Sequence, residues 1–514
     1  MKTKVLHFTF PGVKPKVVDG ESRGDDGPMH KWHEELIKTS NALLTKPCEN
    51  LVLPSFAPIS AFNEAVLRGD LLKVAKGTLI EVELTDRDKY KPDQIDSSIK
   101  AVWIAEIVHM VGYYFLCRWL GAPKSDGGFW VHAANGIVHP VGWCESKRDS
   151  FYFLCPPSHI FELKTSQEWA DYILNRVNNR FTLNVLYDES KANVYACKFN
   201  VGDRLEVVHD DESTSVVPAV ITRTCGRRIL LDVSRPDVDS NDAYSKDNYW
   251  RDQSDDLIYY VAFGAEQGYN LRANKRYKEH TEKIAKALKE GTTPQYSRHD
   301  LSFPKVVEWK ETESTAKWEK SMSLEIFDRI DTNLRILKPA RVLRVMKHGY
   351  LQVGPEGRDI QDDSFVIHQS SPMLFPVGYA KEHGIRLKDP DSPDDNSEFL
   401  WEPFLKRTGF KPAPKHFFHD SVNCSVPFLV GQRMEAIDQN EKVICPAKVK
   451  EIKGRLLLIS FDGWGEEFDQ LYDFRSNELL PCGWCEMQGH RLQPPVKAMI
   501  DSEEGEPSRK KHKT

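Results

Sequence analysis

The chain alternates apolar and polar residues in four similar places. In the last of them the alternate positions flank the dipeptide Lys453-Gly454 and are occupied by Val449, Ile452, Leu456, Leu458 and Ser460. Alternation around such a turn predicts a β-hairpin with half-buried strands. Each hairpin carries a small residue at a matching place and follows an apolar segment with a central glutamate. These residues are Ala105, Ala219, Ala340 and Ala447, and Glu81, Glu206, Glu325 and Glu435. The pattern predicts four copies of a small β-barrel core.

A short phrase closes each copy and marks the length of the repeat. It reads PVGWC at 140–144, YVAFG at 260–264, PVGYA at 376–380 and PCGWC at 481–485. Its second residues are 120, 116 and 105 residues apart, at Val141, Val261, Val377 and Cys482. Spacing this regular is typical of a tandem array.

Helical arms are predicted before the barrel cores, for example at His30–Leu44 and Ser166–Asn179. In the second arm Trp169, Tyr172 and Ile173 lie on one apolar face, which must pack against a barrel. We therefore expect arms and barrels to interlock as one rigid body.

The predicted layout has four repeats between two terminal segments. It consists of an N-terminal extension at 1–27, repeats at 28–150, 151–270, 271–389 and 390–496, and a basic tail at 497–514. The most loop-like join is the segment DPDSPDD at 389–395.

The composition narrows the class of protein. A chain of 514 residues that is 40% hydrophobic and 28% charged is typical of a soluble protein with several domains. Its ten scattered cysteines predict reduced thiols inside the cell. The apolar stretch before Pro11 is too short for a signal peptide. The nearly apolar segment Ala101–Leu120 contains Glu106 and His109, so we predict no membrane span.

The net charge of −6 argues against a protein that coats nucleic acid, but two basic segments remain. One is a predicted helix with Lys275, Arg276, Lys278, Lys283 and Lys286; the other is the tail at Arg509–Lys513. The helix could contact DNA weakly or be a solvated face. The tail could be a nuclear localisation signal or a solvated end.

The fourth copy carries a more specific set of residues. A G-x-x-x-E-A-hydrophobic-D element contains Gly431, Glu435, Ala436 and Asp438, and an F-D-x-W element contains Phe461, Asp462 and Trp464, followed by Phe468 and the PCGWC phrase. This set resembles the malignant brain tumour (MBT) repeat, and the whole chain is similar to the four-repeat, Polycomb-group-like MBT chromatin proteins that read methyl-lysine. The resemblance implies a mainly β fold with helical arms. Each of the four tandem MBT repeats would have an SH3- or Tudor-like small β-barrel core and an N-terminal helical arm, and the repeats would pack into one rigid array.

These residues predict a binding site for methylated lysine. Phe461, Trp464 and Phe468 can form three walls whose π-faces attract a methylammonium group. Asp438 can close the bottom, and its carboxylate favours mono- and dimethyl-lysine, which still have an N–H to donate. By the resemblance, Asn440 and Cys445 also line the pocket. Phe468 stands where the family commonly has Tyr, which leaves the aromatic wall intact.

The first three copies lack this combination in either of two registers. Counting back from the closing phrase gives Leu120, Pro123 and Gly127, then Ser240, Ala243 and Asp247, then Glu356, Asp359 and Asp363. Counting forward from the matched alanines gives Trp119 and Ala122, Val233 and Pro236, and Gly354 and Gly357. The acid position reads Leu84, His209, Asp328 and Asp438. We predict that the first three copies form a scaffold or bind partners through other surfaces.

Two kinds of chemistry compete with this interpretation. Cys482 and Cys485 form a CxxC, which could serve thiol exchange or zinc, but the other closing phrases do not keep the pair. We therefore expect no enzyme activity, cofactor or metal. As the resemblance implies, we expect a nuclear reader of methylated histone tails in transcriptional repression, with histone H3 as target, its lysine 9 as a guess, and repressive chromatin proteins as partners. The alternative is a chromatin scaffold that contacts nucleic acid.

Overall fold

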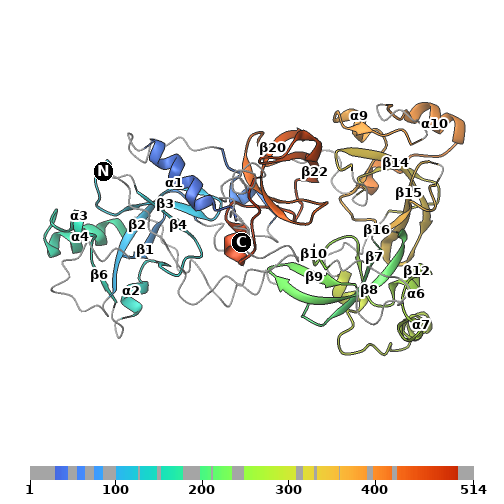
Figure 1. Ribbon diagram of the computed structural model, residues 1–514, viewed down its shortest axis with the longest axis horizontal. Helices are drawn as coiled ribbons and strands as arrows, with labels where there is room; N and C mark the ends of the chain where they lie inside the picture. The colour runs from blue at the N-terminus through green and yellow to red at the C-terminus, as the bar shows by residue number, and fades with distance from the viewer. Residues whose placement is uncertain are drawn as a thin grey trace, which may run out of the picture.

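One path of five strands occurs four times in the computed structural model (Figure 1). In each sheet the spatial order is fourth, third, second, first and fifth strand. The first sheet contains β1 (Leu79–Glu83), β2 (Lys100–Val111), β3 (Tyr114–Trp119), β4 (Phe129–His132) and β5 (Val138–His139). The second contains β7 (Arg204–His209), β8 (Glu212–Cys225), β9 (Arg228–Asp232), β10 (Tyr249–Asp252) and β11 (Ile258–Tyr259).

The third and fourth sheets follow the same path. The third contains β13 (Ser323–Ile326), β14 (Ile336–Val345), β15 (Tyr350–Pro355), β16 (Phe365–His368) and β17 (Leu374–Phe375). The fourth contains β19 (Arg433–Ile437), β20 (Ile444–Lys453), β21 (Leu456–Phe461), β22 (Gln470–Asp473) and β23 (Leu479–Leu480). In the first three sheets a sixth strand pairs in parallel with the second: β6 (Tyr152–Leu154), β12 (Asn270–Leu271) and β18 (Arg386–Leu387). The sheets are called repeats 1 to 4 below.

The structure describes residues 29–43, 55–63, 74–84, 100–125, 128–147, 152–177, 197–209, 212–233, 248–307, 316–328, 333–357, 359–390, 397–418 and 425–495. The expected extension at 1–27, the basic tail at 497–514 and most of the join at 389–395 lie outside these residues. Among the described helices, none has both the length and the apolar character to cross a membrane.

The predicted hairpins are confirmed, and their apolar character is explained by burial. The four matched alanines are buried on the second strand of each sheet. One residue of that strand bulges at the same place in every repeat, and a bulge bends a strand as a small barrel requires. The segment Ala101–Leu120, nearly apolar in sequence, is the β2–β3 hairpin inside repeat 1.

The repeat glutamate joins the first strand of each barrel to its closing phrase. In repeat 4, Glu435 accepts hydrogen bonds from the backbone N–H groups of Gly483 (2.7 Å) and Cys485 (2.8 Å). These groups begin the short helix α11 (Trp484–Gln488), so the carboxylate caps a helix N-terminus. Gly483 has φ 87°, a left-handed conformation that favours glycine. The same pair of bonds recurs at Glu81, Glu206 and Glu325.

The arm helices pack on the barrel that precedes them in the chain. In α10 (Trp401–Thr408), Trp401 donates its indole N–H to Glu325 of repeat 3 over 2.8 Å. In α7 (Lys275–Glu290), the Tyr277 hydroxyl contacts Glu206 of repeat 2 over 3.3 Å. The helix α4 (Ser166–Val177) places Trp169 against Trp103 of repeat 1, with ring centroids 5.3 Å apart.

The first arm closes the array because it packs on the last barrel. In α1 (Trp32–Leu43), Trp32 donates its indole N–H to Glu435 of repeat 4 over 2.9 Å, although 403 residues separate them. Phe56 also pairs with Arg433 on β19 in a parallel bridge. The two ends of the repeat array are therefore held together, which is the interlocking that the amphipathic arms predicted.

Repeats 2, 3 and 4 also hold one another through their hairpin turns. The Lys347 N–H of repeat 3 donates to Gln267 of repeat 2 (3.0 Å), and the Arg455 N–H of repeat 4 donates to Tyr379 of repeat 3 (2.8 Å). The Cys225 thiol of repeat 2 contacts the Gln488 carbonyl of repeat 4 at 3.4 Å, which closes a ring of three.

Repeat 1 joins the ring from outside. The Tyr113 N–H in its hairpin turn donates to the Cys482 carbonyl of repeat 4 (2.8 Å). Gly112 of this turn has φ 53°, and an added Cβ would overlap the Cys482 carbonyl oxygen. Figure 1 shows the resulting arrangement, with repeat 4 between repeat 1 and the pair formed by repeats 2 and 3.

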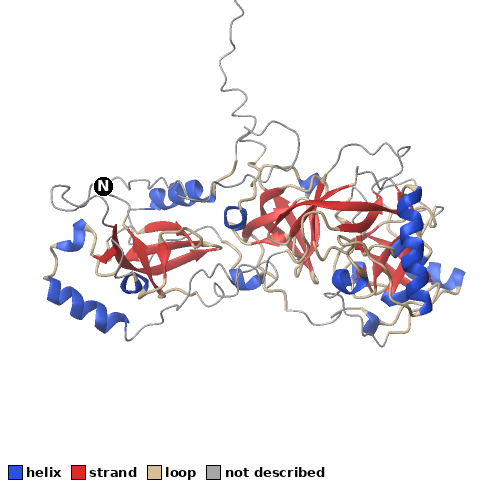
Figure 2. Cartoon of the chain, turned by 90° about the horizontal axis from the view of Figure 1, so that it is seen from below, coloured by secondary structure: helices blue, strands red, loops and turns tan. Residues whose placement is uncertain are grey.

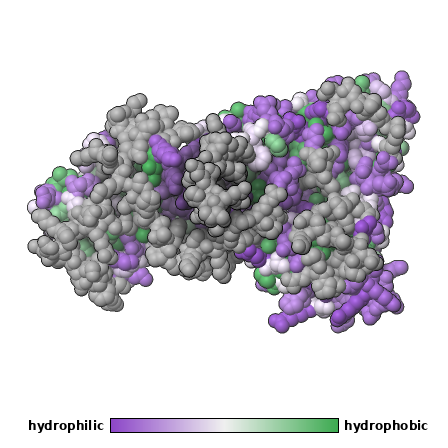
Figure 3. Space-filling view, viewed as in Figure 1, coloured by the Kyte–Doolittle hydropathy of each residue, from purple (hydrophilic) through white to green (hydrophobic). Residues whose placement is uncertain are grey.

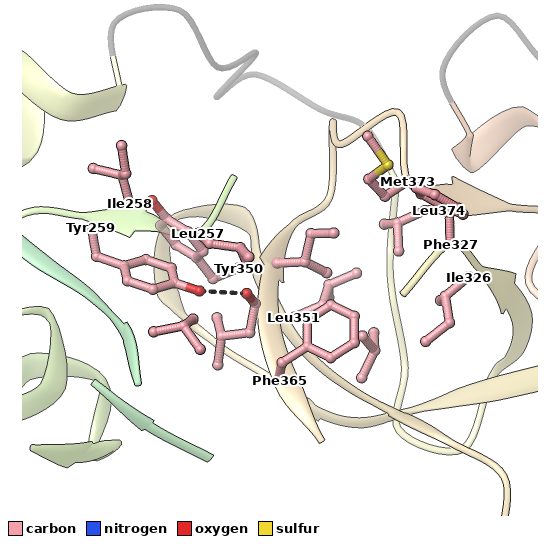
Figure 4. Packing of buried hydrophobic residues seen from close by; sticks show 14 of the residues in the cluster. Leu257, Ile258, Tyr259, Ile326, Phe327, Tyr350, Leu351, Phe365, Met373 and Leu374 are labelled. Atoms are coloured by element: carbon pink, nitrogen blue, oxygen red, sulfur yellow. Dashed lines mark hydrogen bonds between the residues drawn. The ribbon is translucent and has the colours of Figure 1, made fainter. Parts of the chain in front are cut away.

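Apolar packing is continuous across these contacts. Tyr259 of repeat 2 lies against Tyr350 of repeat 3, with ring centroids 5.9 Å apart, and its hydroxyl donates to the Val366 carbonyl over 2.6 Å (Figure 4). Leu351 and Phe365 extend the same cluster into the core of repeat 3. Because barrels share core residues, the repeats form a single body, as the sequence predicted. Figure 2 shows the helices at the margins of the sheets.

Burial raises the pKa of Glu435 from its ordinary value of 4.5 to about 7, although the hydrogen bonds that it accepts from N–H groups act to lower the pKa. The folded protein then holds this proton more tightly than the unfolded chain, so the contribution of Glu435 to stability is full below pH 4.5. It is lost as the pH rises through about 7. Glu435→Gln does not titrate. We expect the unfolding free energy of wild type, minus that of the variant, to be smaller at about pH 8 than at about pH 5 in urea titrations. An unchanged difference contradicts this expectation.

Removal of the arm donor tests the closure of the array. Trp32→Phe keeps the packing but leaves Glu435 without its indole donor, and we expect a loss of about 1 to 3 kcal/mol in the free energy of unfolding. Trp401→Phe should have a similar effect through Glu325. Trp143→Phe, at a half-buried tryptophan of repeat 1, is the control and should change stability less. Equal effects of Trp32→Phe and Trp143→Phe in thermal and urea unfolding would argue against the closure.

Candidate functional site

The predicted aromatic residues lie along one turn of repeat 4. Phe461 ends β21, pairs with Ala447 and is 3% exposed. Trp464 packs half-buried against the core cluster that contains Phe461, and its backbone N–H donates to the Phe461 carbonyl (3.2 Å). Phe468 ends the short helix η10 (Glu466–Phe468) and is 43% exposed. The rings of Trp464 and Phe468 meet edge to face at 5.0 Å and 70°. The structure thus places the three aromatics on a corner that opens to solvent.

Asp438 lies in the loop after β19 and is 5% exposed. Its Oδ1 accepts hydrogen bonds from the backbone N–H groups of Asn440 (2.8 Å) and Glu441 (3.2 Å), and from the side-chain amide of Gln470 (2.8 Å). No described residue donates to its Oδ2. One carboxylate oxygen is therefore anchored by the loop, and the other can accept a hydrogen bond from a ligand.

The two residues predicted from the resemblance have different settings. Cys445 on β20 is buried, and burial together with the nearby Asp438 charge raises the pKa of its thiol to about 12. It is a neutral, apolar neighbour of the acid. Asn440 is exposed on the loop turn, where its backbone N–H holds Asp438.

Gln470 and Tyr472 on β22 support the acid, and neither was predicted from the sequence. Gln470 donates to Asp438, and its Oε1 accepts from the Gln439 N–H (2.9 Å). The Tyr472 hydroxyl lies 2.6 Å from the Ile437 carbonyl and 2.7 Å from Gln470 Oε1. The strand register puts an aromatic residue at the Gln470 position in every other repeat: Phe129, Tyr249 and Phe365. An alignment of this strand would have singled out Gln470.

Strand pairing decides between the two sequence registers. Phe461 pairs with Ala447, and Trp119 pairs with Ala105, so the forward count is correct in repeat 1. In repeat 3, Pro355 pairs with Ala340, so the predicted Gly354 is wrong by one residue. The reason is an extra residue in the β14–β15 hairpin, whose turn contains the short helix η8 (Lys347–Gly349).

The backward count fails because loop lengths after the third strand differ between repeats. In the strand register, Leu120 and Glu356 each follow the counterpart of Phe461 by one residue. Further positions from the two counts lie in described loops. They are Pro123, Asp359 and Asp363 from the backward count, and Ala122 and Gly357 from the forward count. Other counted positions lie outside the described residues: Gly127, Pro236, Ser240, Ala243 and Asp247.

The described parts of repeats 1 to 3 each lack an element of the site. In repeat 1, Trp119 packs against Phe129, with ring centroids 4.3 Å apart and ring planes tilted by 32°, but Leu84 stands at the acid position. In repeat 2, Val233 takes the place of the first aromatic wall. In repeat 3, Asp328 is paired with Lys338 over 2.8 Å. Lys338 occupies the strand position of Cys445, so an internal ammonium already satisfies this acid.

Neighbouring segments hold the aromatic turn of repeat 4. Arg433 donates to Asp462 of the turn over 2.6 Å and also to Glu35 of α1. The Leu471 N–H donates to the Leu334 carbonyl of repeat 3 (2.8 Å), and Arg335 reaches the Glu466 carbonyl (3.2 Å). Repeat 3 therefore contacts the turn that carries the walls, and the first arm is linked to that turn through Arg433.

Two competing sites receive no support from the geometry. Cys482 and Cys485 are buried, and burial raises the pKa of both thiols well above the ordinary value, so neither is a thiolate. No group of three His, Cys, Asp or Glu side chains that could hold a metal occurs in the described part of the chain.

The basic residues of α7 lie on a hydrophilic surface (Figure 3). Acidic residues alternate with them, as in the Lys275–Glu279 and Lys286–Glu290 pairs, which is the pattern of a solvated face.

Comparison with known proteins gives consistent matches over the whole array. The chain matches the family described as the mbt repeat over residues 93–160, 203–278, 322–394 and 432–498. Protein lin-61 of Caenorhabditis elegans is 34% identical over 471 residues, which cover 86% of this chain and 74% of that protein. MBT domain-containing protein 1 of Homo sapiens is 30% identical over 445 residues, which cover 86% of this chain and 65% of that protein.

The Polycomb protein Sfmbt of Drosophila melanogaster is 29% identical over 447 residues, which cover 85% of this chain and 35% of that protein. A crystal structure of the four MBT repeats of Sfmbt, in complex with the peptide RHR (me)K VLR, has a TM-score of 0.72 and 27% identity. It covers 92% of this chain and 100% of the solved chain. The four matched repeats and this agreement in fold show that the chain belongs to the MBT repeat family, as a four-repeat protein similar to Polycomb-group chromatin regulators.

Proposed function

We propose that repeat 4 binds methylated lysine and that the protein is a reader of methylated histone tails. The observation that carries the proposal is the setting of Asp438, a buried carboxylate with one oxygen anchored and the other without a described donor. It lies in the repeat that also presents Phe461, Trp464 and Phe468. The related four-repeat region of Sfmbt was solved with a peptide whose printed sequence contains a methylated lysine, and this supports the proposal.

The site would recognise charge and shape together. A methylammonium group is attracted to aromatic faces, and an N–H that remains on it can donate to Asp438 Oδ2. About 1 kcal/mol for each of the aromatic walls and about 2 kcal/mol for the charged hydrogen bond correspond to a dissociation constant of about 0.2 mM. Flanking peptide contacts or several binding events on one chromatin fibre would supply tighter binding.

The wider role follows from the class of protein to which the site belongs. As a relative of Polycomb-group proteins, the chain would act in the nucleus, in transcriptional repression, without catalysis of its own. Its targets would be histone tails, with histone H3 first and its lysine 9 as a guess, and its partners would be other repressive chromatin proteins. Weak contact with DNA through α7 would add to this role and would not replace it.

Substitution of the site residues tests the proposal directly. We expect Trp464→Ala and Asp438→Ala each to weaken binding of a dimethyl-lysine peptide by about five- to 150-fold, since each removes about 1 to 3 kcal/mol of interaction. Binding is measured by calorimetric or fluorescence titration, with circular dichroism to show that the fold is kept. Trp143→Ala in repeat 1 is the matched control and should bind like wild type. If both site variants bind as tightly as the control, the site lies elsewhere.

The preference among methylation states tests the role of the carboxylate. Mono- and dimethyl-lysine should bind more tightly than trimethyl-lysine, which has no N–H for Asp438, and unmodified lysine should bind weakly because its ammonium is more strongly hydrated. Asp438→Asn should reduce the preference for dimethyl- over trimethyl-lysine. An array of peptides in the four states, read with wild type and with this variant, gives the ratio. Equal binding of dimethyl and trimethyl peptides by wild type would contradict a role for the acid.

A further inference from the structure

Arg228 of repeat 2 contacts the loop of repeat 4 that carries Asp438. Arg228 begins β9, next to the turn that docks on repeat 4, and is 3% exposed. Its Nη2 donates to the backbone carbonyl of Lys442 over 3.1 Å. Lys442 lies between Asp438 and the strand β20, so this is a contact from repeat 2 to the loop of the proposed site.

The guanidinium of Arg228 is held in place by aromatic neighbours. Its Nη1 lies 2.9 Å from Nε2 of His490, and it stands over the ring of Trp250 at 5.5 Å. Burial and the Arg228 charge lower the pKa of His490 to about 3, so the imidazole is neutral. Its Nδ1 donates to the Arg491 carbonyl (3.0 Å), which leaves Nε2 as the acceptor for Arg228. A neutral imidazole thus orients the guanidinium, and Nη2 points to the loop.

The loop transmits the position of Lys442 to Asp438. The Lys442 N–H donates to the Asp438 carbonyl, and the Asp438 N–H donates to the Val443 carbonyl, both over 2.8 Å. Lys442 has φ 59°, a left-handed conformation that costs free energy for a residue other than glycine and persists only where its surroundings hold it. The hydrogen bond from Arg228 is made to the carbonyl of this residue.

We propose that Arg228 is a positioning residue of the methyl-lysine site, so that repeat 2, which has no cage of its own in the described residues, determines where the carboxylate of repeat 4 stands. This proposal rests on the proposed function. It assigns Arg228 no contact with the ligand. Without Arg228 the carbonyl of Lys442 loses its charged donor, and the loop can turn Asp438 away from the aromatic corner. We expect the aromatic walls to keep their places because they lie on a separate segment, between the end of β21 and η10.

The test compares Arg228→Met with Arg227→Met in the full chain. Arg227 is the adjacent residue, but its guanidinium pairs with Asp252 (3.1 Å) inside repeat 2, so it controls for loosening of the hairpin. Dimethyl- and trimethyl-lysine peptides are titrated into each protein. We expect Arg228→Met to bind the dimethyl peptide about fivefold more weakly or worse, with less loss for the trimethyl peptide, so that the preference falls. Arg227→Met should keep both the affinity and the preference.

Arg228→Lys is a milder variant that keeps a buried positive donor. It should recover part of the affinity and of the dimethyl preference, and it replaces Arg228→Met if that variant does not fold. Equal weakening for both peptides, or no change in either in a folded Arg228 variant, overturns the positioning role while leaving the proposed function in place. A wild-type protein that binds none of the methylated peptides overturns the proposed function and this proposal with it.

Discussion

The rest of the architecture depends on the hydrogen bonds between the buried glutamate at the start of each barrel and the closing phrase of that barrel. A carboxylate in an apolar core is costly unless its oxygens are saturated, and in this chain each one accepts two backbone N–H groups at the start of a short helix. That bond pair pins the closing phrase to the first strand. In repeats 2, 3 and 4 a further donor arrives from an arm helix, through Tyr277, Trp401 and Trp32. The hydrogen bonds of the buried glutamate in each of these barrels are therefore completed by a segment outside that barrel.

This dependence makes the array closed instead of linear. The arms α7 and α10 each donate to the glutamate of the barrel before them, and the glutamate of the last barrel receives its arm donor only because the first arm returns to it. Contacts between hairpin turns and closing helices add a ring through repeats 2, 3 and 4. A stack of repeats that touch only their sequence neighbours would have free ends. Here the parts of repeat 4 that carry the proposed site are contacted by the first arm, by repeat 2 and by repeat 3.

Much of the fold and part of the site could be predicted because they rest on local patterns. Alternation around Lys453-Gly454 and the matched glutamates identified the hairpins and their number, since side-chain period and turn residues are properties of short segments. Positions that depend on loop length were predicted less accurately. An extra residue in the third hairpin moved the counterpart of Phe461 from Gly354 to Pro355, and the support of Asp438 by Gln470 was not visible from spacing. The pairing of Asp328 with Lys338 was equally hidden, because strand register and not sequence distance brings the two together.

The sequence by itself determined four barrels, amphipathic arms, and an acid and three aromatics in the last repeat, because each of these is written within a few residues. Only the tertiary structure decided which barrel each arm covers, that Trp32 donates to Glu435, and that Arg228 reaches the loop of Asp438. The last two contacts join residues more than 200 positions apart. They follow from which apolar faces must be covered and which buried polar groups still need a partner, and both conditions are set only when all four barrels are packed together.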